Sequence, residues 1–227
     1  MMRRVVLITR PEPGLRETLA RVQAQGWHGV ASPVMHIQPT PPIADYPCQA
    51  MLVTSRQVLP FLAHQNRERL VLTVGEATAR HARAMGFQHV EAASGDQEAL
   101  EALCQQKGLR GPSLVLACGR GRDGQLYGAG LVQSLGVQRL EAYHVRPVPS
   151  LSDAALRALA HDEVTAILFY SRETVTLFME LCPAELRAVL RHCRALCLSE
   201  AIAAHARSYD IWGEVEFGPP LTLLGHI

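Results

Sequence analysis

A glycine-rich loop with two arginines follows the apolar run at residues 114–117. The loop reads Gly119-x-Gly121-x-x-Gly124, and Arg120 and Arg122 occupy two of its variable positions. Glycine lets backbone N–H groups come close to an anion, and a guanidinium group adds a matched positive charge. The same spacing is the dinucleotide-binding fingerprint when a strand precedes it and a helix follows. The segment therefore predicts an anion-binding loop whose ligand is a nucleotide or another anion.

The residues that follow the loop test the nucleotide hypothesis. A dinucleotide-binding unit places an acidic residue roughly 20 positions on, at the end of the next strand. Glu141 lies 22 residues after Gly119, but it stands at the start of an extended segment rather than at its end. An NAD(P)-dependent oxidoreductase that uses this loop is therefore an alternative and not the main hypothesis.

Polar or small residues also stand at the ends of the other apolar runs. In an open α/β sheet these ends meet at one edge, where helix N-termini bind ligands. A serine there can hold an anion or cap the following helix, and the residues alone leave both roles open. The strand-end groups are Thr9-Arg10, Thr54-Ser55-Arg56, Gly75-Glu76, Cys118-Gly119-Arg120, Tyr170-Ser171-Arg172 and Ser199-Glu200.

Tyr143 is the candidate for proton transfer. The sequence has no G-x-S-x-G, no H-E-x-x-H and no P-loop lysine, so conventional catalytic motifs are missing. Tyr143 belongs to the extended segment 140–149, from which it can face a cleft between domains. A tyrosine placed there can donate a proton to a leaving hydroxyl, and the alternative is half-buried strand packing.

The elements that must position these residues alternate along the chain. Short apolar runs are each followed by a segment with helical periodicity, which predicts an α/β fold with parallel sheets flanked by helices. The predicted strands are 5–8, 50–53, 71–74, 114–117, 166–170 and 195–198. The predicted helices are 14–25, 55–63, 77–85, 96–106, 123–135, 152–161, 171–181, 183–192 and 201–209.

The chain also repeats itself. GEATARHAR at 75–83 matches SEAIAAHAR at 199–207, and AMLVTSR at 50–56 matches AILFYSR at 166–172. A looser pair, LITRPEPG at 7–14 and LACGRGRDG at 116–124, places an arginine-bearing loop after each strand. Three matches in the same order predict two similar domains built from two copies, which start near residues 5 and 113.

Two proline-ended segments break the alternation of strands and helices. Residues 32–42 and 140–149 have an extended pattern that prolines keep from becoming helical. We expect them to form a two-stranded linker between domains. One domain would be discontinuous, with residues 1–35 and 149–227, and the other would span residues 38–142.

Composition narrows the function classes. The 227 residues carry a net charge of +1, so no general field favours nucleic acid or a membrane surface, and no apolar stretch is long enough for a membrane span. The apolar run at 5–8 is too short for a signal peptide, which predicts a cytoplasmic protein. The six cysteines lack C-x-x-C spacing and are expected to be reduced thiols, with no metal site.

The ordered set of motifs resembles the uroporphyrinogen-III synthase family over nearly the whole chain. The set comprises TRP at 9–11, TS at 54–55, VGEATA at 74–79, LACGRGRDG at 116–124, EAYHVRP at 141–147, FYSRETV at 169–175 and LSEAIA at 198–203. The resemblance implies two α/β domains joined by a two-stranded ladder. It also implies a lyase of haem and porphyrin biosynthesis that cyclises linear hydroxymethylbilane to uroporphyrinogen III, with loss of water and inversion of ring D. No cofactor would be needed.

The resemblance also assigns residues. Tyr143 matches the family tyrosine that assists departure of the hydroxyl group, and the expected substrate-binding residues are Arg10, Ser55, Thr78, Cys118, Gly119, Arg120, Ser171 and Ser199. Ile202 departs from the family, which often has threonine there. The expected partners are the tetrapyrrole substrate and transiently the preceding enzyme of the pathway, with the protein a monomer. A non-catalytic two-domain anion-binding module is the second alternative.

Overall fold

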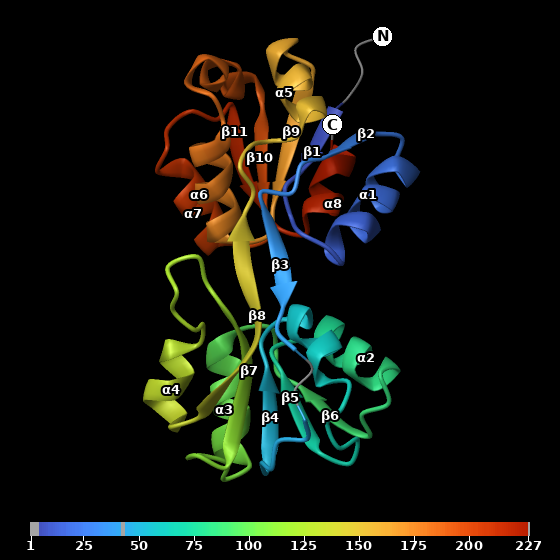
Figure 1. The fold of residues 1–227 in the computed structure, drawn as a ribbon. Coiled ribbons are helices and arrows are strands. Elements are labelled where there is room, and N and C mark those ends of the chain that lie inside the picture. The colour runs from blue at the N-terminus through green and yellow to red at the C-terminus, as the bar shows by residue number, and fades with distance from the viewer. Residues whose placement is uncertain (1–4, 42–43, 227) are drawn as a thin grey trace. The chain divides into compact units, whose positions relative to one another are not determined.

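The computed structural model describes residues 5–41 and 44–226, so Pro42 of the first predicted linker segment lies outside the described residues. The chain forms two compact units (Figure 1). Unit 1 combines residues 1–36 with 147–227, and unit 2 is residues 37–146. We propose that these units are the two domains expected from the sequence.

Unit 1 is built on a parallel five-stranded sheet with the order β11-β10-β9-β1-β2. All four residues of β1 are buried, because helices cover both faces of a parallel sheet. Its strands are β1 (Val5–Ile8), β2 (His28–Ala31), β9 (Val164–Phe169), β10 (Arg194–Cys197) and β11 (Glu214–Phe217). Its helices are α1 (Gly14–Ala24), α5 (Asp153–Ala160), α6 (Arg172–Leu181), α7 (Glu200–Arg207) and α8 (Pro220–Leu223), with 3₁₀ helices η2 (Ala184–His192) and η3 (Leu224–His226).

Unit 2 is built on a six-stranded sheet with the order β3-β8-β7-β4-β5-β6. The pairs from β8 to β6 are parallel, and β3 runs antiparallel to β8 at the edge (Figure 1). Its strands are β3 (Met35–Pro39), β4 (Ala50–Val53), β5 (Leu70–Thr73), β6 (His89–Ala92), β7 (Leu114–Arg120) and β8 (Gln138–Pro147). Its helices are α2 (Glu76–Ala84), α3 (Gln97–Gln106) and α4 (Ala129–Leu135), with the 3₁₀ helix η1 (Arg56–Leu62).

The two sheets share one topology. The order β2-β1-β9-β10-β11 in unit 1 corresponds, strand by strand, to β8-β7-β4-β5-β6 in unit 2. The first sequence copy supplies β1 and β2 to unit 1 and β4 to β6 to unit 2. The second copy supplies β7 and β8 to unit 2 and β9 to β11 to unit 1. Each unit therefore completes its sheet with strands from both copies.

The repeated helices keep the same contacts. In α2, Arg83 Nη1 lies 2.6 Å from Glu76 Oε1, and Nη2 donates to the Val90 carbonyl in β6. In α7, Arg207 Nη1 lies 2.8 Å from Glu200 Oε1, and Nη2 donates to the Val215 carbonyl in β11. The repeated arginine thus ties each helix to the strand that follows it.

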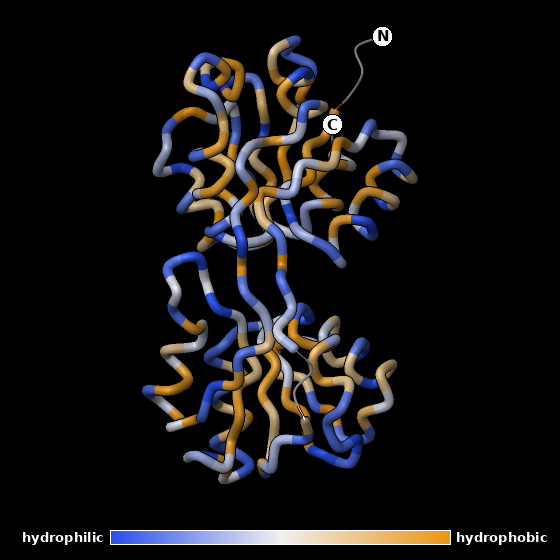
Figure 2. The backbone as a smooth tube through the Cα atoms, viewed as in Figure 1, coloured by the Kyte–Doolittle hydropathy of each residue, from blue (hydrophilic) through white to orange (hydrophobic). Residues whose placement is uncertain are grey.

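The core of each unit lies on its sheet, where the central strands carry buried apolar side chains. Figure 2 shows the hydrophobic colour concentrated on these strands. One buried cluster in unit 2 includes Leu52, Leu72, Leu100 and Leu116. A corresponding cluster in unit 1 includes Val6, Ile8, Leu168 and Leu196. Within the described part of the chain, no helix is long and apolar enough to cross a membrane.

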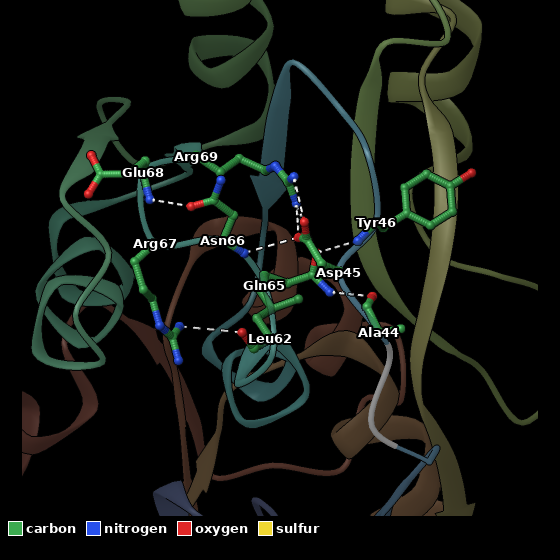
Figure 3. A network of polar contacts seen from close by, with 9 residues as sticks. All are labelled: Ala44, Asp45, Tyr46, Leu62, Gln65, Asn66, Arg67, Glu68 and Arg69. Atoms are coloured by element: carbon green, nitrogen blue, oxygen red, sulfur yellow. Dashed lines mark hydrogen bonds and ion pairs between the residues drawn. The ribbon is translucent and has the colours of Figure 1, made fainter.

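A polar network ties the approach to β4 to the approach to β5 (Figure 3). Gln65 is buried, and its Nε2 donates to the Ala44 carbonyl at 2.9 Å. Asp45 Oδ1 accepts from the Asn66 N–H at 3.0 Å and from Arg69 Nη1 at 2.8 Å. The network fixes the amino ends of two neighbouring strands, opposite the edge where ligands bind in such sheets.

Asp45 should make stability depend on pH. The Asn66 N–H and then Arg69 lower the pKa of this carboxyl below its ordinary value of 3.8. A depressed folded-state pKa stabilises the protein above the unfolded-state pKa, and the effect is lost as pH falls through the folded-state value. We expect the melting temperature of Asp45→Asn to be lower than wild type near neutral pH, with the difference shrinking below about pH 4. A difference that stays constant down to about pH 3 would contradict this role.

Candidate functional site

The glycine loop does not lead directly into a helix. Strand β7 continues to Arg120, and α4 begins only at Ala129. The predicted helix 123–135 is therefore wrong over its first six residues. Between the two elements, the N–H of Gly121 donates to the Gln125 carbonyl at 2.9 Å, and the N–H of Gly124 donates to the Gly121 carbonyl at 3.1 Å. These N–H groups close turns within the loop, and the strand–loop–helix arrangement of a dinucleotide site is not formed.

Arg120 is held by an acid on the neighbouring strand. Its Nε donates to Glu141 Oε2 at 2.8 Å, its Nη2 binds the same oxygen, and its Nη1 binds the Gly124 carbonyl. His144 Nε2 lies 2.6 Å from the other oxygen of Glu141. The hydrogen bond from Arg120 lowers the pKa of the Glu141 carboxyl. Glu141 is thus a counter-ion of the loop, and a substrate carboxylate would have to share or displace it.

Tyr143 lies against the first glycine of the loop. A bulge between Cys118 and Gly119 makes Gly119, and not its neighbour, the register partner of Tyr143. A Cβ added to Gly119 would lie 2.1 Å from Cε2 of the Tyr143 ring and 2.7 Å from its hydroxyl oxygen. The Phe61 ring packs with its centroid 6.4 Å from that of Tyr143, which is only 5% exposed. The absent side chain at Gly119 therefore makes room for the phenol.

The other predicted site residues of unit 2 stand at the same carboxyl edge of its sheet. Ser55 caps η1, and its hydroxyl accepts from the Gln57 N–H at 3.2 Å. Thr78 lies half-buried in the first turn of α2. Cys118 is buried in β7, where desolvation raises the pKa of its thiol to about 11. The thiol is therefore neutral near pH 7 and is not an activated nucleophile.

The predicted site residues of unit 1 stand at the carboxyl edge of its own sheet. Ser171 caps α6 in a reciprocal capping box with Thr174. Ser199 precedes α7, is exposed and makes no side-chain cap hydrogen bond. Arg10 Nη1 donates to the Thr18 hydroxyl at 3.2 Å, and its guanidinium carbon lies 4.0 Å from the centroid of the Tyr170 ring.

The sequence groups most of these residues by strand ends but does not predict the contacts among them. Residues 118–120 and Tyr143 come together on adjacent strands of unit 2, although Tyr143 was predicted on the linker segment 140–149 and not in a strand-end group. His144 was not predicted as a site residue, Glu141 was considered only as the acid of a dinucleotide site, and Tyr170 was named only within the strand-end group Tyr170-Ser171-Arg172. The EAYHVRP segment carried a signal for the first two, because acid and imidazole flank the tyrosine there. Among the described residues, no group of three or more His, Cys, Asp or Glu side chains can hold a metal ion.

The chain is similar in sequence to one protein family and in fold to solved structures. The family model described as uroporphyrinogen-III synthase HemD matches residues 16–215. The fold is similar to uroporphyrinogen-III synthetase from Helicobacter pylori, with 13% identity, a TM-score of 0.60 and coverage of 99% of this chain and 98% of that one. It is also similar to a mutant uroporphyrinogen III synthase from Thermus thermophilus, with 18% identity, a TM-score of 0.55 and coverage of 98% and 96%. A search of curated proteins finds no match.

Proposed function

This chain belongs to the uroporphyrinogen-III synthase family, and we propose from that membership that it closes linear hydroxymethylbilane into uroporphyrinogen III. The substrate loses its terminal hydroxyl as water and leaves a reactive azafulvene. Ring D is then inverted as the macrocycle closes. The observation that carries this proposal is the family match over residues 16–215, because it spans strands from both units.

The geometry of the carboxyl edges supports the same chemistry. The substrate carries carboxylates on every pyrrole, and strand-end N–H groups, hydroxyls and guanidinium groups can hold them. The enzyme then has to position the chain so that the inverted closure is faster than spontaneous closure without inversion. A site with many anion-binding groups and one phenol, Tyr143, fits that task better than a site built around strong acids and bases.

The finer assignments extend the proposal. Tyr143 protonates the departing hydroxyl, and Arg10, Ser55, Thr78, Cys118, Gly119, Arg120, Ser171 and Ser199 contact the substrate. The reaction is that of a cyclising hydro-lyase, it proceeds without a cofactor, and the protein acts as a cytoplasmic monomer. The protein receives its unstable substrate by transient contact with the preceding enzyme of the pathway.

An isomer assay tests the reaction directly. The protein is supplied with enzymatically generated hydroxymethylbilane, and the products are oxidised and separated into isomers I and III. We expect isomer III to dominate and to form faster than isomer I does in buffer alone, because catalysed closure inverts ring D. Isomer I alone, at the rate of the buffer control, would exclude the proposed reaction. Tight binding of hydroxymethylbilane without turnover would favour the alternative that the protein is a non-catalytic anion-binding module.

A further inference from the structure

The carboxyl edge of the unit 1 sheet carries an apolar row that the anion-binding residues do not explain. Tyr170 directly follows β9, and the guanidinium of Arg10 lies over its ring at 4.0 Å from the centroid. Tyr170 is half-buried and packs against the buried cluster that contains Leu168 and Leu196. An arginine stacked on an aromatic ring is held in place, and it sets a positive charge beside the apolar face of that ring.

Leu198 directly follows the neighbouring strand β10, as Tyr170 follows β9 (Figure 1 shows β9 beside β10). Cys197 pairs with Phe169, and the Leu198 N–H donates to the Phe169 carbonyl at 3.0 Å. Extending this register by one residue sets Leu198 opposite Tyr170, and the alternation of the two strands predicts that both lie on the face of Leu168 and Leu196. Leu196 is fully buried, whereas Leu198 is 47% exposed.

Unit 2 shows that the topology does not require this exposure. Val74 is the counterpart of Leu198, because its N–H donates to the Val53 carbonyl at 3.3 Å in the corresponding place. Val74 is partly buried and packs against the core cluster of its unit. Thr54 is the counterpart of Tyr170 in the repeated AMLVTSR and AILFYSR segments. A small polar residue and a covered valine in one unit thus correspond to an aromatic ring and an exposed leucine in the other.

We infer that Tyr170 and Leu198 form a shelf for one pyrrole ring of the substrate, and that Arg10 binds a carboxylate arm of that ring. A pyrrole with acetate and propionate arms combines an apolar face with negative charge at its rim. The shelf offers the complementary pair, an apolar surface beside a stacked guanidinium. Ser199 follows Leu198 directly, so a second arm of the same ring comes within reach of the N-terminus of α7. This inference rests on the proposed function, because that function supplies the ligand.

Leu198→Ala tests the shelf with little disturbance of the fold, since the side chain is about half exposed in unit 1. Removing the contacts of its branched end should raise KM for hydroxymethylbilane about threefold to tenfold and leave kcat within about twofold. Leu198→Met should restore KM to near the wild-type value, because it returns a flexible apolar chain of similar volume. An unchanged KM for Leu198→Ala in an active protein would overturn the inference.

Phe217→Ala is the matched control. Phe217 is also exposed at this edge, but it pairs with Cys197 and so points to the opposite face from Leu198. Its truncation should leave KM unchanged, and an equal rise in KM would show that the effect does not come from the shelf. Fluorescence titration with uroporphyrin III, an octacarboxylate with the same arms, separates the shelf from the reaction. Weaker binding to Leu198→Ala in a protein without turnover would keep the shelf and exclude the reaction, whereas equal binding would exclude the shelf.

Discussion

Gly119→Ala should reduce turnover about a hundredfold, because the new methyl group occupies the place of the Tyr143 ring. The added Cβ would lie 2.1 Å from a ring carbon and 2.7 Å from the hydroxyl oxygen, and neither distance is tolerated without movement. The Tyr143 ring also packs near the ring of Phe61 and is almost fully buried. The phenol therefore has to leave its position, and overpacking of this kind also costs about 1–3 kcal/mol of stability.

Gly121→Ala provides the control within the same loop. A Cβ there would approach Asp123 Oδ1 at 2.9 Å and the Tyr127 ring at 3.1 Å, which belong to side chains that can shift. Isomer III formation by Gly121→Ala should stay within about tenfold of wild type. In the double variant Gly119→Ala/Tyr143→Ala, turnover should stay low, because the phenol is absent. Wild-type turnover in Gly119→Ala would show that the position of Tyr143 against this glycine is not needed.

Helices and strands were predictable wherever the local pattern of apolar and polar residues matched the burial of those residues in the folded protein. The apolar runs at 5–8 and 50–53 became β1 and β4 with the predicted bounds, since a strand buried on both faces reads as a continuous apolar run. The predicted helix 96–106 became α3 to within one residue, and Gly108 follows its end with a φ of 66°, as glycine commonly does after a helix. The edge strands β2, β6 and β11 were missed, because each is short and at least partly exposed and has no apolar run to mark it.

The helix predicted from residue 123 failed for a reason already present in the sequence. Gly124 and Gly128 adopt φ values of 79° and 84°, which lie outside the right-handed helical region. Glycines at 121, 124 and 128 allow the backbone to form turns in this segment. This preference for turns prevailed over the helical pattern that the apolar residues between the glycines indicated. The fingerprint spacing was correctly found, but its structural context was not the one that nucleotide binding requires.

The contacts of the candidate site could not be predicted, because they depend on strand register. Arg120 meets Glu141 only because β7 and β8 are neighbours, and a one-residue bulge decides that Tyr143 lies opposite Gly119. In the same way, the pairing of Cys197 with Phe169, 28 residues earlier in the chain, sets the positions of Leu198 and Tyr170 at the ends of β10 and β9. The periodicity of apolar residues predicts which residues stand at a strand end. Which of these residues touch depends on how strands distant in the sequence pair.

Tyr143→Phe should lower kcat more than any single serine-to-alanine change at the strand ends. A proton donor in the transition state contributes about a hundredfold or more, whereas one hydrogen bond to a carboxylate shared among several groups contributes up to about tenfold. The phenylalanine keeps the ring against Gly119 and Phe61, so the loss of the hydroxyl is isolated from packing. Ser199→Ala is the fair comparison, because Ser199 makes no cap hydrogen bond whose loss would weaken α7.

The split between kinetic constants distinguishes the two roles. Loss of a proton donor lowers kcat and kcat/KM together, whereas loss of a carboxylate contact raises KM and changes kcat little. We therefore expect Tyr143→Phe to change kcat with KM near wild type, and Ser199→Ala to show the reverse pattern. Equal kcat for Tyr143→Phe and wild type would remove the acid role from Tyr143. The reactive azafulvene would then form without help from the phenol, and catalysis would rest on the positioning of the carboxylates alone.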